Sequence, residues 1–346
     1  MDRKPYRPNP RVREQIRALH RLDNHHGWFA LAEDWFQIIG ACAGVLSIPL
    51  LVPGASPLLS VLLWTIGLLA IASRQRALEH LLHEASHGHL FKNQKLNKWV
   101  TFCFVAFPNF NSLEEYRTSH TVHHKSLGDD DDPDLLHYKR LRVDELPVPM
   151  KRFVLYYVVY NGIRISYLQL EDHIRRIRGC FQESESARAY RSIFLFGVLP
   201  IAGYVLGWTN LLLIWFVPRL FVLPVIRYFG EISKHAVLIK NTNYLHMSRN
   251  RFPSFLERYL ASAHNDNYHL VHHLFPGIPF YNLPRAHRVL LQDPDYALAH
   301  HCAGYINVSS DIPTITKEMI SSRSSDEMVL KSGLGVTPHE LTGGDA

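Results

Sequence analysis

Histidines gather in four short stretches of the chain, at spacings that suit metal ligands. The stretches read "LLHEASHGH", "SHTVHH", "EISKH" and "YHLVHH". Residues three or four apart share one face of an α-helix, and neutral imidazole binds Zn, Cu, Fe and Ni. The pattern predicts a metal site built from nine residues: His83, His87, His120, His123, His124, His235, His269, His272 and His273.

The number of imidazoles indicates two metal ions. A catalytic zinc ion takes about three protein ligands and keeps one position open, so nine histidines exceed what one ion uses. A hydrolase that activates water would need fewer ligands. Two redox-active iron ions reacting with O2 would supply the oxidant that breaks an unactivated C–H bond. We therefore expect a di-iron centre.

Four largely apolar runs separate the histidine stretches. They cover residues 35–52, 58–73, 192–208 and 210–230. A membrane-spanning helix needs roughly 17–25 largely apolar residues, and these runs lack the polar stripe of a helix on a soluble core. The sequence predicts an all-α integral membrane protein with four transmembrane helices in two hairpins and a cytosolic helical cap that holds the histidines.

Lys and Arg are concentrated outside the two short connectors of the predicted hairpins. By the positive-inside rule both termini and residues 74–190 are cytoplasmic, and every histidine stretch then lies on that side. We expect a cytosolic N-terminal segment (1–34), a membrane-embedded domain (35–310) and a mobile polar tail (311–346). The net charge of +6 suits anionic lipid headgroups, and no basic stripe interleaved with aromatics indicates nucleic-acid binding.

At these residues the chain resembles the membrane fatty acid desaturase superfamily, which includes related hydroxylases and carotenoid ketolases. "HEASH", "HTVHH" and "HLVHHLFP" are similar to its three histidine boxes, and the resemblance covers roughly residues 30–300. His235 matches an additional ligand position of stearoyl-CoA-type desaturases, and Glu231 lies where such enzymes place a polar residue. The resemblance implies a non-haem di-iron centre and O2-dependent desaturation of an acyl-lipid chain, in fatty acid metabolism.

Polar residues beside the histidines are candidates to orient the ligands. A ligating imidazole usually donates its other N–H to a carboxylate or a carbonyl. Besides Glu231, the candidates are Glu84, Asp132 and Asp134 in "GDDDDPDL", and Asp266 and Asn267 before the last stretch.

The sequence lacks a built-in source of electrons. It has no G-x-G-x-x-G for a nicotinamide or flavin, no cysteine set for an iron–sulfur cluster and no "HPGG" haem signature. Desaturation with O2 consumes two outside electrons, so we expect a separate ferredoxin or cytochrome with its reductase, docked through basic residues. The absent haem domain favours a bacterial inner membrane over an endoplasmic reticulum.

Several alternatives stay open at this point. A hydroxylase or ketolase would share the same site, and a desaturase of a small non-lipid metabolite would have the same boxes. A metal transporter or sensor is disfavoured, because transporters bind ions near the bilayer midplane and the four apolar runs contain no histidine. Arg219, deep in the fourth run, would either bind an anionic group of the substrate or pair within the helix bundle.

Overall fold

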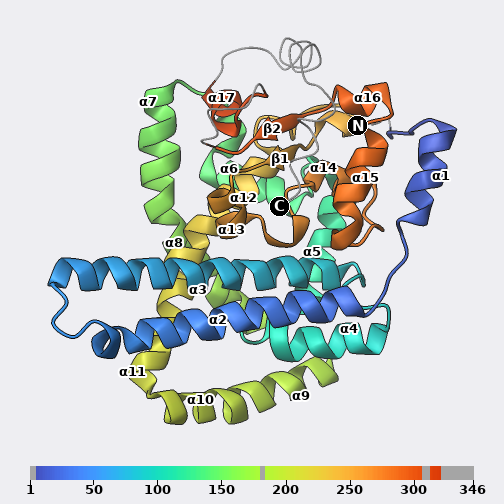
Figure 1. Ribbon diagram of the computed structural model, residues 1–346. Coiled ribbons are helices and arrows are strands. Elements are labelled where there is room, and N and C mark those ends of the chain that lie inside the picture. Colours follow the sequence, from blue (N-terminus) through green and yellow to red (C-terminus); the bar gives the residue numbers. More distant parts are fainter. Residues whose placement is uncertain (1–4, 180–183, 306–311, 321–346) are drawn as a thin grey trace. The chain divides into compact units, whose positions relative to one another are not determined.

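The computed structural model describes residues 5–179, 184–305 and 312–320, with the backbone alone for 172–179. The chain forms two compact units, each built from separated stretches. We call residues 1–22, 118–161 and 229–346 the histidine unit, and residues 23–117 and 162–228 the span unit. Helices dominate both units (Figure 1), as the sequence predicts.

The span unit contains long helices and several π-helical turns. Its elements are α2 (His25–Leu51), α3 (Pro57–Ser86), α4 (Gln94–Thr101), η1 (Phe102–Ala106), α9 (Glu185–Ile193), η5 (Phe194–Val198), α10 (Leu199–Leu206), α11 (Trp208–Leu211), η6 (Leu212–Phe216) and η7 (Pro218–Val222). Three helices pass from one unit to the other along the chain: α5 (Leu113–Ser126), α8 (Asn161–Gly179) and α12 (Leu223–His235).

Four helical segments of the described chain are long and apolar enough to cross a membrane. They are His25–Leu51, Pro57–Ser86, Glu185–Leu206 and Trp208–His235, which confirms the predicted number of spans. Large apolar side chains on them face outward, among them Phe36 at 80% and Phe196 at 84% exposure. Such exposure is unfavourable in water but suits contact with lipid tails.

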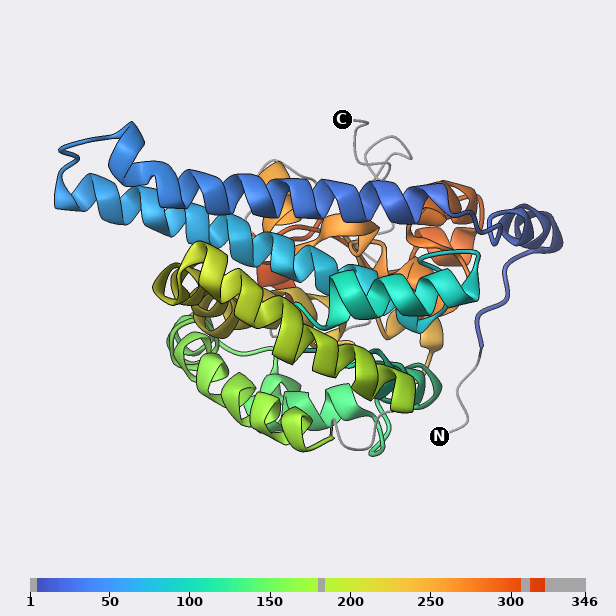
Figure 2. The same cartoon turned by 90° about the horizontal axis from the view of Figure 1, so that it is seen from below.

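Helices α2 and α3 run side by side in both views of the span unit (Figures 1 and 2). Val45 and Ile71 are buried together with Ile214 in one apolar cluster. Helix α3 starts at Pro57, where a missing N–H costs nothing, and the Ser56 hydroxyl accepts a hydrogen bond from the Leu59 N–H. The same helix continues beyond the apolar run to Ser86 and so carries the first candidate histidine, His83.

A buried ion-pair group holds Arg219 inside the span unit. Its Nη1 lies 2.8 Å from Glu79 Oε1, and its Nη2 donates to the Asn109 carbonyl at 2.5 Å. Arg227 binds the same Glu79, with Nε 2.9 Å from Oε2. Of the two interpretations of Arg219, pairing within the bundle is the one that these contacts support. The π-helical turns η6 and η7 flank Val217 and interrupt the regular α-helix in this segment.

The histidine unit contains shorter elements around a small sheet. They are α1 (Pro10–Ala18), α6 (Pro133–Leu141), η2 (Val143–Glu145), α7 (Met150–Arg152), η3 (Phe153–Tyr160), η8 (Tyr244–His246), β1 (Asn250–Phe252), α13 (Phe255–Ala261), η9 (Ala263–Asn265), α14 (His269–Leu274), η10 (Phe280–Asn282), α15 (Leu283–Leu290), α16 (Pro294–Ala297), β2 (His301–Ala303) and α17 (Ile315–Ile320).

The two short strands depart from the predicted all-α fold. Strands β1 and β2 pair in parallel, with Asn250 opposite His301 and Phe252 opposite Ala303. Segments of three residues are too short for an alternating pattern to be visible in the sequence. Of the predicted polar tail (311–346), residues 312–320 carry α17, whose Ile315 and Met319 are buried, and the rest lies outside the described residues.

Helix α1 packs against α15 within the histidine unit. Its apolar residues Val12 and Ile16 are buried. Hydrogen bonds tie both ends in an antiparallel arrangement: the Asn9 N–H donates to Asp293 Oδ2 at 3.0 Å, and Asn282 Nδ2 donates to the Leu19 carbonyl at 2.8 Å. The two helices therefore pack through their apolar sides and leave their charged sides outward.

Candidate metal centre

Four buried imidazoles converge inside the histidine unit. His123 comes from α5, His235 from the end of α12, and His269 and His273 from α14. One nitrogen of each ring lies within 4.8 Å of those of the other three. The Nε2 atoms of His269 and His235 are 2.8 Å apart, and those of His273 and His269 are 3.0 Å apart. This group is called the buried tetrad below.

In two rings of the tetrad, the hydrogen bond made by Nδ1 determines that Nε2 is the nitrogen with the free lone pair. His235 Nδ1 lies 2.9 Å from the Met247 carbonyl oxygen, and His123 Nδ1 lies 2.9 Å from Asp132 Oδ1. A carbonyl or a carboxylate can only accept, so in each ring Nδ1 carries the hydrogen. In the neutral ring Nε2 then presents its lone pair, as a metal ligand must.

Burial keeps most of the tetrad in the neutral form. The pKa of His269 and of His273 lies well below the ordinary value, because burial disfavours the charged ring and neighbouring histidines add repulsion. For His123, burial alone would lower the pKa, but the carboxylates of Asp134 and Asp132 raise it above the ordinary value. A metal cation at this place would compete with the proton on His123 and benefit from the same carboxylates.

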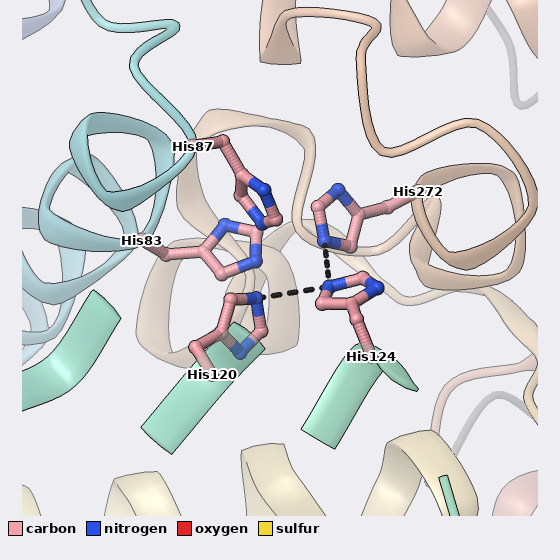
Figure 3. A group of neighbouring side chains, drawn as sticks. All are labelled: His83, His87, His120, His124 and His272. Carbon is pink, nitrogen blue, oxygen red and sulfur yellow. Dashed lines mark hydrogen bonds between the residues drawn. The ribbon is translucent and has the colours of Figure 1, made fainter. Parts of the chain in front are cut away.

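Three further imidazoles of the histidine unit form a second group. His124 Nε2 lies 3.0 Å from His120 Nε2 and 3.0 Å from His272 Nε2 (Figure 3). The Tyr244 hydroxyl donates to the carbonyl of His124 at 2.6 Å and so fixes this turn of α5. We call these three residues the triad.

The H-x-x-H-H spacing divides each helix between the two groups. On α5, His120 and His124 are four apart and belong to the triad, whereas His123 points into the tetrad. On α14, His269 and His273 are four apart and belong to the tetrad, whereas His272 joins the triad. Because adjacent residues of a helix diverge by about 100°, one such motif can serve two metal positions.

The remaining predicted pair lies in the span unit, at the end of α3. The rings of His83 and His87 are 5.0 Å apart, as expected for residues four apart on a helix, and Figure 3 draws them too. Nδ1 of His83 lies 3.3 Å from Glu84 Oε1. Burial, with the proximity of His83, lowers the pKa of His87 to about 3, so its ring is neutral at physiological pH.

Comparison with known proteins assigns this chain to a family. Residues 56–305 match the model of the fatty acid desaturase family. The chain belongs to the fatty acid desaturase family. It is also 32% identical over 300 residues to the dihydrorhizobitoxine desaturase of Bradyrhizobium elkanii, an alignment that covers 83% of this chain and 81% of the relative. The chain is therefore an oxidoreductase of the desaturase type, and its four candidate spans indicate a membrane protein.

In this desaturase, Asp132 contacts His123 of the tetrad and stabilises the loop between α5 and α6. Its side chain is fully buried. Besides His123, its Oδ1 accepts from the Asp134 N–H at 2.9 Å, which caps α6, and its Oδ2 accepts from the Gly128 N–H at 2.7 Å. The carboxyl of Asp134 lies 3.5 Å from His123 Nδ1. Within the acidic run, the sequence had favoured these two positions.

The other polar candidates of the desaturase contact cations and backbone. Glu231 lies 3.2 Å from Lys234 Nζ, and the same ammonium group lies 3.0 Å from Asp266. Asp266 also binds Arg251 at 2.6 Å, and Asn267 Nδ2 donates to the Arg251 carbonyl at 3.0 Å. These contacts fix the segment that leads into α14, so Asp266 and Asn267 position the helix that carries three of the candidate histidines.

Two groups that support the histidines of the desaturase have no signal in the sequence. The Met247 carbonyl orients His235, and a backbone carbonyl is available at any residue. Asn250 Oδ1 accepts from the N–H groups of Leu270 and Val271 at 3.1 and 3.4 Å and so caps the start of α14. Asn250 is 20 residues from Leu270 in the chain, so no local pattern connects the two.

Proposed function

We propose that this protein is an O2-dependent non-haem di-iron desaturase that converts a CH2–CH2 unit of its substrate into CH=CH. The observation that carries the proposal is the division of seven imidazoles of one unit into a tetrad and a triad of converging nitrogens. An all-imidazole donor set is suited to divalent iron, and the hydrogen bonds of Asp132 and Met247 prepare lone pairs for it.

In this proposal the tetrad holds one iron and the triad holds the other. His83 and His87 are proposed as further iron ligands, because the first histidine box has no other assigned role. When bound, the two irons supply the redox chemistry with O2. The protein's own contribution is to hold the rings neutral, to orient them through Asp132 and Met247, and to keep water away from the buried tetrad.

The substrate class is the finer part of the proposal. The relative in Bradyrhizobium elkanii is named for dihydrorhizobitoxine, and its similarity extends over most of both chains. This favours a small metabolite as substrate. The acyl-lipid chain expected from the sequence is the second candidate, favoured by the family and by four helical segments that are long and apolar enough to cross a membrane. We further propose that the desaturase domain covers residues 35–310 and that both termini are cytoplasmic, in a bacterial inner membrane.

Mass spectrometry of cells that express the protein with a ferredoxin and its reductase tests this function. We expect a product two hydrogens lighter than its precursor, in either the small-metabolite or the lipid extract, and the extract in which it occurs identifies the substrate class. His272→Ala should abolish the product. His25→Ala, at an exposed histidine outside both groups, is the matched control and should leave it unchanged.

Three outcomes would contradict parts of the proposal. A product that gains one oxygen would reassign the protein as a hydroxylase. Purified protein that holds zinc alone after growth with ample iron would refute the di-iron centre. Full activity in His272→Ala would refute the role of the triad.

A further inference from the structure

Helices α1 and α15 present exposed arginines on the surface of the histidine unit. Two lie on α15 and three on α1, and one follows α1. We define the basic face as Arg11, Arg13, Arg17, Arg21, Arg285 and Arg288, all of which are exposed. Glu14 is the one acidic residue within α1, and α15 contains none. The packing of these two helices therefore concentrates positive charge.

The apolar sides of both helices are already covered. Val12 and Ile16 of α1 are buried, as are Leu283 and Leu290 of α15. Among the described residues, the large apolar side chains that are exposed do not include any on α1 or α15. A helix that inserts into a membrane surface offers an apolar side to the acyl chains. The basic face lacks this and instead has the character of a polar, charged docking surface.

Helix α15, which carries part of this face, packs directly against a helix that carries three of the proposed ligands. Helix α15 packs against α14, and its inward residue His287 lies 3.4 Å from Asn250 Nδ2. Asn250 in turn caps α14, where His269, His272 and His273 are located. A carrier bound at the basic face would thus lie against the element that connects directly to the predicted metal ligands.

The reaction needs such a carrier. Removing two hydrogens from the substrate yields two electrons and two protons, whereas reducing O2 to two water molecules takes four of each. The balance is CH2–CH2 + O2 + 2 e⁻ + 2 H⁺ → CH=CH + 2 H2O, with the protons from solvent. The two missing electrons must come from a reduced protein outside this chain.

We propose that the basic face docks the small acidic one-electron carrier that reduces the metal centre. The inference rests on the proposed di-iron function. Complementary charge steers association and raises its rate at low salt, and arginine binds carboxylates in a fixed, bidentate geometry. An acidic ferredoxin, delivering one electron at each of two encounters, has the matching chemistry.

Stopped-flow reduction of the iron-loaded, full-length protein tests the docking surface. The test variant combines Arg285→Glu with Arg288→Glu. The control makes the same change of charge with Lys151→Glu and Lys317→Glu, two exposed positions on other helices of the histidine unit. Each protein is mixed anaerobically with a reduced [2Fe–2S] plant-type ferredoxin, and separately with reduced methyl viologen, a small cation that needs no docking surface.

We expect the second-order rate constant for reduction by ferredoxin at low salt to be about tenfold or more lower in the test variant than in the wild type. The wild-type rate constant should decrease as the salt concentration rises, and that of the test variant should not. The control should stay within about twofold of the wild type, and methyl viologen should reduce all three proteins at one rate. A ferredoxin rate that is unchanged in the test variant would overturn the docking proposal. So would an equal loss with methyl viologen, because the loss would then not depend on docking of a protein carrier.

Two further outcomes separate the competing explanations. If neither reductant reduces the wild-type protein, the di-iron function itself is wrong. The measurement is repeated in nanodiscs of phosphatidylcholine, without and with phosphatidylglycerol. A defect of the test variant that occurs only in the anionic discs would assign the basic face to lipid headgroups and overturn docking of a carrier.

Discussion

Replacing Asp132 by Asn tests both roles of one buried carboxylate, which caps α6 and orients His123. The carboxylate accepts three hydrogen bonds: from His123 Nδ1 at 2.9 Å, from the Asp134 N–H at 2.9 Å and from the Gly128 N–H at 2.7 Å. An amide has a single oxygen, so in either orientation of Asn its NH2 group faces at least one donor. The side chain has almost the same size, and the change therefore acts through hydrogen bonding and charge.

The expected loss of stability follows from the hydrogen bond that the amide NH2 group cannot accept. A buried hydrogen bond to a charged group contributes about 1.5–3 kcal/mol, so we expect Asp132→Asn to lower the free energy of unfolding by about 2 kcal/mol. Loss of a group that orients a ligating imidazole weakens metal binding or activity about 10- to 100-fold. Both effects should appear together, because one side chain caps α6 and orients His123.

The assay is retention of iron during competition with a chelator, measured beside thermal unfolding in detergent. Asp130→Asn is the matched control: it lies in the same loop, its side chain is 95% exposed, and its contact is with Lys139 at the surface. We expect the control to match the wild type in both measurements. The reasoning is refuted if Asp132→Asn retains iron as well as Asp130→Asn does, or if its stability is unchanged.

Three further predictions concern buried charges and the metal. Glu79→Gln leaves Arg219 and Arg227 without their shared carboxylate and should cost about 3–5 kcal/mol, measured as a lower thermal midpoint in detergent. Burial alone would raise the pKa of Glu318, but Arg249 lowers it to about 2 from 4.5. Above pH 4.5 the ionised carboxylate therefore adds about 3 kcal/mol to the free energy of unfolding, and this contribution is lost as the pH falls to 2. Glu318→Gln should be less stable than the wild type at pH 7. Unfolding curves at lower pH should show that the difference in stability becomes smaller. Removing iron with a chelator should abolish turnover and lower the thermal midpoint, and Fe²⁺ but not Zn²⁺ should restore turnover.

The sequence was informative where the chemistry repeats at a helical period. Spacings of three and four residues predicted one shared face for His120, His123 and His124 and another for His269, His272 and His273. In the structure the residues four apart do share a group, whereas His123 and His272 each join the other group. The four candidate spans could be predicted from composition, because each is a continuous run of apolar residues long enough to cross a membrane. These features depend on neighbours within a few residues of one another.

Contacts between distant parts of the chain could not be predicted in this way. Arg219 binds Glu79 from 140 residues away, and nothing near Arg219 in the sequence indicates that partner. The choice between adjacent histidines is similar: His123 and His124 look alike in the sequence, but His123 contacts the carboxylate of Asp132, whereas His124 contacts His120 and His272. Strands β1 and β2 were not predicted, because their pairing depends on packing between parts of the chain that are distant in the sequence.

The pairing of α1 with α15 sets an order of events during synthesis. Helix α1 ends at residue 18 and its partner at residue 290. At about 5–20 residues per second the ribosome needs roughly 15 to 50 seconds to make the chain between them. For that time Val12 and Ile16 have no native surface to cover them. The three histidines of α14 are made only shortly before α15, so the proposed iron ions would bind at a late step, after most of the chain has been made.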